Sequence, residues 1–182
     1  MSRLFIAVFA LVLSACSVMQ VTPVDPVTGY FKTNKQASTI VNKPVDLDTL
    51  KSLLLIPDQY FVQGQIENIK YFDQLITLDD LEKEIIINGL QDKITDVKSK
   101  IGINKAATAY KPFLWFRYDT RSEKNKEYGQ FILTDPKTQE DIFIAEVYLD
   151  RVWAGVHDNN TWYPLFNEMI KYIEEHSKTY RK

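Results

Sequence analysis

The sequence has few of the residues on which most enzymes and metal sites depend. Its 182 residues include one cysteine and two histidines, His157 and His176. Neither histidine stands in a zinc-binding spacing such as HExxH, and the chain has no GxSxG nucleophile motif and no glycine-rich phosphate loop. A formal net charge of −2 gives no basic field that would attract nucleic acid. We therefore expect no metal, no cofactor and no nucleic-acid partner.

The first fifteen residues have the composition of a secretion leader. Arg3 supplies a positive charge, an apolar run follows from Leu4 to Leu13, and the small residues Ser14 and Ala15 precede Cys16. An apolar run of this length is too short to span roughly 30 Å of hydrocarbon as a helix. We therefore expect this segment to be a signal peptide that is removed.

Leu13, Ser14, Ala15 and Cys16 resemble the lipobox that the bacterial lipoprotein signal peptidase recognises. The resemblance implies cleavage before Cys16, which then carries three acyl chains, palmitate among them; two or more chains anchor a protein stably in a membrane. Ser17 stands where an aspartate would retain such a protein at the inner membrane. In a host with two membranes the resemblance therefore implies the periplasmic face of the outer membrane. The alternative is an ordinary secretory signal whose cysteine falls at the cleavage site by coincidence.

Removal of the first 15 of 182 residues leaves 167, which suits one domain with a tether. Residues 16–45 are rich in Val, Thr, Pro, Asn and Gln and have no sustained periodicity. They are predicted to form a flexible tether with a stretched reach of about 100 Å, followed by a periplasmic domain over residues 46–182. The alternative is that part of the segment, from Gly29 to Phe31, packs on the domain as an edge segment.

The first half of the domain shows two strand patterns and two helix patterns. Leu53 to Ile56 is a short apolar run that ends at a proline, so it predicts a buried strand. A helix over residues 58–69 and a strand over 71–76 are expected next. Thr77 and Asp80 form a capping-box pair, which predicts a helix over residues 78–88 that Gly89 ends.

The second half predicts a less regular stretch before residue 112, then an antiparallel meander and a final helix. Its expected strands are residues 113–118, 128–133 and 142–149, with a charged loop at 119–127 and a turn at Asp135. The last element begins at Asn160 or Thr161 and has the pattern of an amphipathic helix.

This order of elements predicts the α+β class. We expect a single small domain in which a mixed, mostly antiparallel sheet has helices packed on one face, with the amphipathic helix at the C-terminus. The segment from Tyr71 to Gly89 and the hairpin through Asp135, Thr138 and Ile142 resemble the anticodon-binding-like α+β domains of small outer-membrane lipoproteins. The resemblance covers about half of the chain.

Glu146 is the carboxylate whose position best fits catalysis, because it interrupts the apolar strand at 142–149. Glycoside hydrolysis needs two carboxyl groups about 5 to 10 Å apart across a cleft. The alternative interpretation is a solvent-facing strand position.

The segment from Arg151 to Tyr163 is the candidate binding loop, since aromatic rings with amides suit sugar stacking or a protein contact. An alternative is that its tryptophans pin the loop on the core. The residues predicted for binding are Trp153, His157, Asp158, Asn160, Trp162 and Tyr163.

These features favour a non-enzymatic lipoprotein that is held at the outer membrane through Cys16 and binds an envelope protein or glycan. Its function would be that of a binding module or an envelope-assembly accessory. One alternative is a periplasmic hydrolase that acts on cell-wall glycan through paired carboxylates. Another is a carrier of a lipidic ligand, which would need an enclosed apolar cavity.

Overall fold

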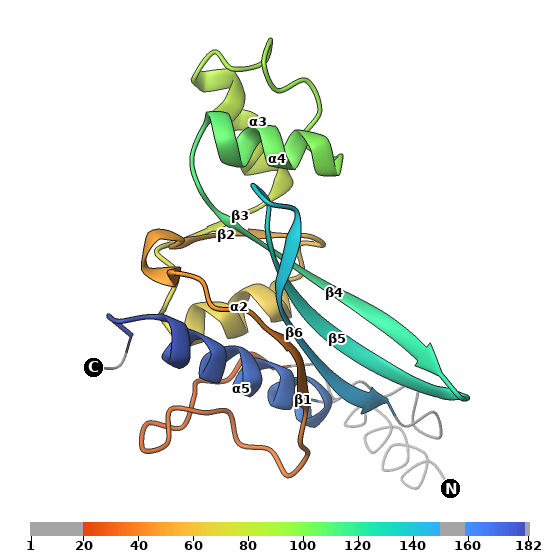
Figure 1. Cartoon of the computed structure of the whole chain (residues 1–182). Coiled ribbons are helices and arrows are strands. Elements are labelled where there is room, and N and C mark those ends of the chain that lie inside the picture. Colours follow the sequence, from red (N-terminus) through yellow and green to blue (C-terminus); the bar gives the residue numbers. More distant parts are fainter. Residues whose placement is uncertain (1–19, 150–158, 181–182) are drawn as a thin grey trace, which may run out of the picture.

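The computed structural model describes residues 20–149 and 159–180, which form a sheet with helices around it (Figure 1). The elements are the strands β1 (Ser38–Asn42), β2 (Ser52–Leu55), β3 (Gln74–Ile76), β4 (Leu114–Glu123), β5 (Lys126–Asp135) and β6 (Glu140–Leu149), the α-helices α2 (Tyr60–Ile69), α3 (Leu78–Ile87), α4 (Lys100–Ala109) and α5 (Asn159–His176), and the short 3₁₀ helix η2 (Leu47–Thr49). No helix in this part of the chain is long and apolar enough to cross a membrane.

The sheet has six strands in the order β1-β6-β5-β4-β2-β3. Strands β4, β5 and β6 form the expected antiparallel meander, and β1 adds to β6 in antiparallel orientation. Strand β2 lies parallel to both β4 and β3. The prediction of an α+β domain with a mixed, mostly antiparallel sheet and a C-terminal helix is therefore confirmed.

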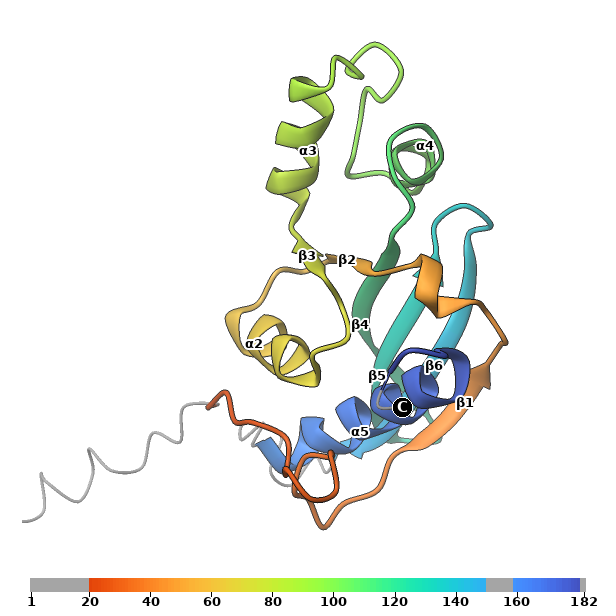
Figure 2. The ribbon, with the colours of Figure 1, turned by 90° about the vertical axis from the view of Figure 1, so that its left-hand side faces the viewer.

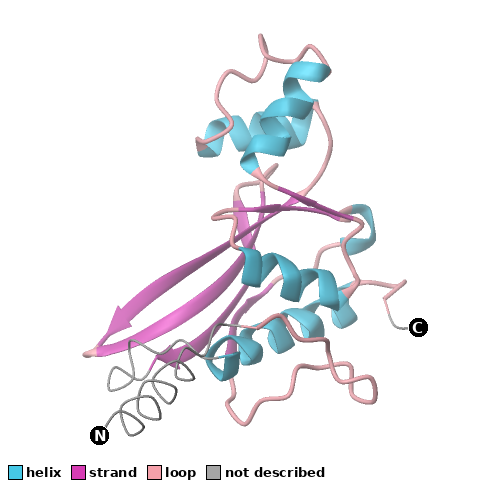
Figure 3. Cartoon of the chain, turned by 180° about the vertical axis from the view of Figure 1, so that it is seen from behind, coloured by secondary structure: helices cyan, strands magenta, loops and turns pink. Residues whose placement is uncertain are grey.

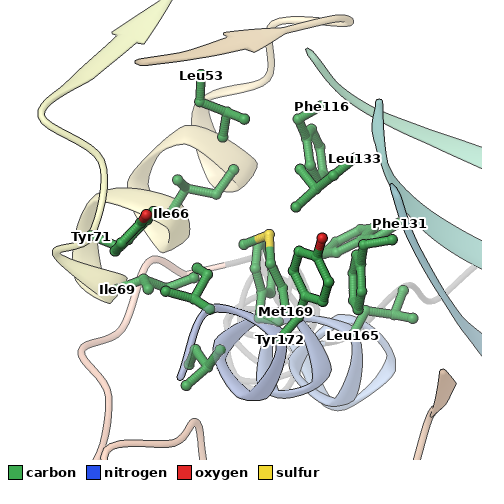
Figure 4. Close-up of a cluster of buried hydrophobic side chains, with 14 of the residues drawn as sticks. Leu53, Ile66, Ile69, Tyr71, Phe116, Phe131, Leu133, Leu165, Met169 and Tyr172 are labelled. Carbon is green, nitrogen blue, oxygen red and sulfur yellow. The ribbon is translucent and has the colours of Figure 1, made fainter. Parts of the chain in front are cut away.

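The main core lies between the sheet and the helices α2 and α5. Leu53, Phe116 and Phe131 from the strands meet Ile66 of α2 and Met169 of α5, and all five side chains are buried (Figure 4). Residues i and i+2 of a strand point to the same face, so Leu53 and Leu55 enter this core together. Helices α2 and α5 thus occupy one face of the sheet, as the pattern predicts.

A second, smaller core lies at one end of the sheet. Leu54 of β2 and Trp115 of β4 point away from the main core and pack with Leu81 and Ile85 of α3 and Ile103 of α4. Figure 2 shows α3 and α4 together beyond that end of the sheet. We call this part of the molecule the α3–α4 lobe. Its two helices form a second core with the sheet, in addition to the core predicted from the sequence.

Several local predictions are confirmed at their key residues. Helix α3 begins after Thr77, whose hydroxyl accepts from the Asp80 amide while the Asp80 carboxylate accepts from the Thr77 amide, and Gly89 follows the helix with a φ of 65°. Strand β2 and helix α2 lie close to their predicted positions, whereas β3 is shorter than predicted.

Two predictions for exposed segments are wrong. Residues 119–127 are not a charged loop, because β4 and β5 continue to Glu123 and Lys126 and turn through Lys124 and Asn125, both at positive φ. Figure 3 shows this long hairpin extending away from the helices. The stretch before residue 112 also contains a helix, α4, which Ser99 caps through a hydrogen bond from the Gly102 amide.

The flexible tether predicted for residues 16–45 is wrong for its described part, since the chain from Gln20 onward packs on the domain. Phe31 is buried in the main core, and β1 pairs with β6 at the edge of the sheet. The segment is rich in valine and threonine, and this composition suits an extended edge strand as well as a linker. The alternative of a packed Gly29 to Phe31 segment is the better description, and the domain includes residues 20–45.

Candidate functional site

The predicted binding loop lies partly outside the described residues. Trp153, His157 and Asp158 fall there, and Asn160 lies in the first turn of α5, where its backbone alone is described. Trp162 and Tyr163 follow in the same helix. The loop as a whole stays a prediction.

The side chains of Trp162 and Tyr163 both pack in the main core. The Trp162 ring stacks on Phe131 with centroids 5.8 Å apart and lies edge-on to Tyr118. The buried Tyr163 ring stacks on Phe31 at 5.1 Å, and its hydroxyl shares a hydrogen bond with the Thr22 hydroxyl. For these two residues the packing interpretation accounts for what the structure shows.

Glu146 is held in an ion pair rather than facing open solvent or a second free carboxylate. The Arg121 guanidinium donates from Nη2 to Oε1 at 2.9 Å and from Nε to Oε2 at 3.0 Å, and Gln130 donates to Oε2 at 3.0 Å. Glu146 is 9% exposed. The hydrogen bonds from Arg121 hold the pKa of the Glu146 carboxyl below its ordinary value. The carboxylate is therefore ionised at neutral pH.

Arg121 also organises the aromatic side chains around Glu146. Its guanidinium pairs with Glu123 and stands 4.7 Å from the centre of the Tyr128 ring, whose own centre is 5.9 Å from that of Tyr148. The strand register explains the row, because Arg121 is opposite Tyr128 and Tyr128 is opposite Tyr148. The result is a guanidinium and two phenol rings in line across three strands.

A second ion pair involves Arg117, which lies four residues before Arg121 on the same side of β4. Arg117 donates from Nη2 to both Asp141 oxygens at 2.8 Å, and the Thr134 hydroxyl donates to the same carboxylate at 2.6 Å. Arg117 is also 5.6 Å from the Trp115 ring centre. These side chains point away from the main core, because they alternate with Leu114 and Phe116.

We call this side of the meander the outer face. It is defined by Arg117, Arg121, Tyr128, Gln130, Asp141, Glu146 and Tyr148. Tyr148 is 48% exposed although β6 lies inside the sheet between β1 and β5. Ion pairs fix the arginines while phenol rings and guanidinium edges reach the surface. Such a surface can stack on a flat group and donate hydrogen bonds.

The sequence contains a signal for this face that is not a catalytic or binding motif. Arg117, Asp119, Arg121 and Glu123 alternate with other residues along β4, a period of two that places all four on one side of a strand. Residues of a loop share no common side, so the loop predicted at 119–127 is inconsistent with this alternation.

The described residues also enclose a surface hollow of about 500 Å³ between the N-terminal segment and the end of α2. Lys51, Tyr71 and Asp25 line it, and the Lys51 ammonium lies 3.5 Å from the Tyr71 ring centre. The Asp25 carboxylate accepts from the backbone amides of Val27 and Thr28, which lowers its pKa. The Asp25 carboxylate therefore stabilises the turn of residues 25–28. Within the described ranges no group of three His, Cys, Asp or Glu side chains could hold a metal ion.

No protein-family model matches the sequence, and no curated protein sequence matches it. Among solved structures, the chain is similar to the LpoB C-terminal domain from Salmonella enterica, with 14% identity and a TM-score of 0.36. It is also similar to the LpoB C-terminal domain from Escherichia coli, with 12% identity and a TM-score of 0.34. Each comparison covers 56% of this chain and 83% of the LpoB chain. A likeness at this level does not assign a function.

Proposed function

We propose that this protein is a lipoprotein of the outer membrane that acts on the periplasmic side as a non-enzymatic binding module or envelope-assembly accessory. The support for the anchor is the lipobox-like sequence that ends in Cys16. Cleavage there removes the leader, and acylation of Cys16 holds the protein at the membrane. Such attachment raises the effective concentration of the domain for partners in the same envelope.

The observation that carries the binding role is the row of Arg121, Tyr128 and Tyr148 on the outer face. Arginine and tyrosine are among the residues that contribute most to protein interfaces, and rings of this kind also stack on sugars. Because Glu146 and Glu123 already fix the guanidinium, its side-chain entropy is lost before a partner binds. The partner class is an envelope protein or glycan, and the loop at 151–163 is a second candidate contact.

The contacts of Glu146 disfavour the alternative of a glycan hydrolase. A general acid in such an enzyme has a raised pKa, so that it still carries a proton at neutral pH. Glu146 instead has a lowered pKa, and Arg121 lies between it and Glu123 with hydrogen bonds to both. The lone pairs of Glu146 are therefore already engaged by Arg121 and Gln130, which does not suit a general acid.

Membrane fractionation tests the anchor. The wild-type chain is expected in the outer-membrane fraction after a high-salt wash, whereas a Cys16→Ala variant is expected in the soluble periplasmic fraction. A Cys16→Ala variant that stays with the membrane refutes lipid attachment at this residue.

Site-specific photocrosslinking tests the binding surface. A photoreactive phenylalanine analogue replaces Tyr148 on the outer face in one variant and Ile87, an exposed residue at the end of α3, in a control. Both variants carry the same probe at an exposed position. We expect adducts with an envelope protein or glycan from position 148 and none from position 87. Equal adducts, or adducts from position 87 alone, would place the contact elsewhere.

A further inference from the structure

The described chain begins on the surface of the domain. The Gln20 carbonyl accepts from the side-chain amide of Gln65 at 3.2 Å, and the Thr22 carbonyl accepts from that of Asn68 at 2.9 Å. The Thr22 hydroxyl also shares a hydrogen bond with Tyr163. Gln65 and Asn68 belong to α2 and Tyr163 to α5, so residues 20–22 are fixed to both helices. Figure 2 shows this start of the described chain, in red, beside α2 and the first turns of α5.

A glycine in α2 makes this close approach possible. A Cβ atom at Gly64 would lie 2.7 Å from Cγ2 and 2.9 Å from Cγ1 of Val21. Atoms at those distances overlap, so a side chain at residue 64 would force the Val21 side chain to turn away from its present position. The N-terminal segment is thus seated against one face of α2 by packing as well as by hydrogen bonds.

This seating sets a limit on the distance between the domain and a lipid anchor. Four peptide units separate Cys16 from Gln20, and a fully extended chain of that length spans about 14 Å. A free tether of 29 residues could reach about 100 Å. If Cys16 carries the acyl chains, the surface of α2 around Gly64 therefore lies next to the lipid headgroups.

We propose that the α2 surface around Gly64 rests on the lipid bilayer, so that the membrane surface itself is a partner of the domain. The inference depends on the lipidation of Cys16 in the proposed function. It adds a fixed orientation, with α2 toward the membrane and the α3–α4 lobe at the far end of the molecule (Figure 2).

Tyr60 is the residue that best fits this contact. It is the first residue of α2, is 83% exposed, and lies one helical turn before Gly64 on the same side of the helix. Tyrosine prefers the interface between hydrocarbon and water, where its ring meets acyl chains and its hydroxyl stays hydrated.

The charge of α2 indicates which lipids it fits. Glu67 is the one charged residue in the helix, which contains no lysine and no arginine. Attraction to anionic lipid comes from basic residues and is screened by salt. The contact is therefore interfacial, and it should form on zwitterionic phosphatidylcholine and persist at high salt.

Fluorescence quenching of the full lipidated chain tests the proposal. Because the Cys16 thiol is acylated, a single introduced cysteine can be labelled with a fluorophore. The probe variant is Glu67→Cys on α2, and the matched control is Glu82→Cys on α3; both remove one exposed glutamate from a helix surface. The lipoprotein is reconstituted in phosphatidylcholine vesicles that contain nitroxide-labelled lipid.

The label at position 67 is expected to be quenched several-fold more strongly than the label at 82, with little change at high salt. A Tyr60→Ser change in the Glu67→Cys background is expected to reduce that quenching without release from the vesicles. Equal quenching at 67 and 82, or stronger quenching at 82, in protein that floats with the vesicles overturns the orientation alone. Protein that does not float with the vesicles overturns the anchor, and the orientation with it.

Discussion

Gly102 is the residue of α4 at which a small substitution should have the largest effect on stability. In an ordinary helix interior, Gly→Ala stabilises the fold by about 1 kcal/mol because alanine loses less backbone entropy. At position 102, however, a Cβ atom would lie 1.2 Å from the carbonyl oxygen of Asp96 and 2.4 Å from the carbonyl carbon of the same residue. Both atoms belong to the backbone and cannot rotate away.

The size of the effect follows from the movement that the methyl group requires. Ordinary van der Waals contact begins at 3.4 Å, so α4 and the segment at Asp96 must separate by roughly 2 Å. That segment carries Ile94 and Val97, which are buried in the small core of the lobe. Burial of one such side chain is worth about 1.5 to 3 kcal/mol, so partial exposure of the pair outweighs the gain in helix propensity. We expect Gly102→Ala to lower the free energy of unfolding by about 2 kcal/mol.

Urea unfolding with hydrogen exchange measures this change and shows where it acts. The free energy of unfolding should fall, and amide protection should fall first in α3 and α4. Gly64→Ala is the control, because the three atoms nearest to its new Cβ belong to the side chain of Val21, whose methyl groups can rotate, and not to the backbone. That change should alter stability by less than about 1 kcal/mol. If Gly102→Ala proves as stable as the wild type, the close approach of α4 to Asp96 is not rigid and the reasoning fails.

Three other predictions concern caps and carboxylates. Thr77→Ala removes the hydroxyl of the capping box and should cost about 1 kcal/mol in urea unfolding, whereas Thr77→Ser should cost much less. The hydrogen bonds from Arg121 lower the pKa of Glu146 in the folded state, so the ionised pair stabilises the fold at pH values above the unfolded-state pKa of this carboxyl. This stabilisation is lost as the pH falls through the folded-state pKa. Glu146→Gln should therefore flatten the decline of stability with acid; an unchanged decline contradicts the assignment. Asp48 accepts from the Ser177 hydroxyl and from two further groups of the C-terminal segment, which lower its pKa. Asp48→Asn should let carboxypeptidase trim that segment faster at neutral pH, whereas an unchanged trimming rate would show that other contacts hold it.

The parts of the fold that the sequence predicted are those in which local and tertiary preferences agree. Thr77 and Asp80 cap a helix whose apolar residues already recur at helical spacing, so local chemistry alone determined α3. Helix α4 is different: its sequence KIGINKAATA mixes the good helix formers alanine and lysine with the weaker Gly, Ile, Asn and Thr, and its apolar stripe is narrow. Packing of Ile103, Ala106 and Ala107 against the lobe stabilises this helix, and that contact is not visible in the sequence.

The strands of the β4–β5 hairpin are hard to recognise in the sequence because much of the hairpin is exposed to solvent. Residues 119–127 are charged, and a charged run usually indicates a loop. Here the ribbon extends beyond the helices, so polar side chains suit both of its sides. The local signal was the pair Lys124 and Asn125, whose positive φ angles suit the tight turn that joins twisted strands.

The candidate site was harder to predict than the fold, because its residues meet only through strand register. Arg121, Tyr128 and Tyr148 lie on three strands, and a shift of one residue in either pairing would place one of them on the opposite face. Glu146 is a candidate from the sequence and does belong to the face, but its partner Arg121 lies in the segment whose charge predicts a loop. Identifying the pair required the full hairpin.

The packing of the N-terminal segment alters how membrane attachment can act. A long free tether would let every face of the domain meet a partner and would favour none, since the chain samples many orientations. With Gln20 fixed to α2 and Cys16 acylated as proposed, about 14 Å of chain would separate the domain from its anchor and restrict rotation about it. The outer face then stands at a limited height above the bilayer. A partner of that face must itself reach close to the membrane, which favours a membrane-bound or membrane-adjacent envelope component over one that lies deep in the periplasm.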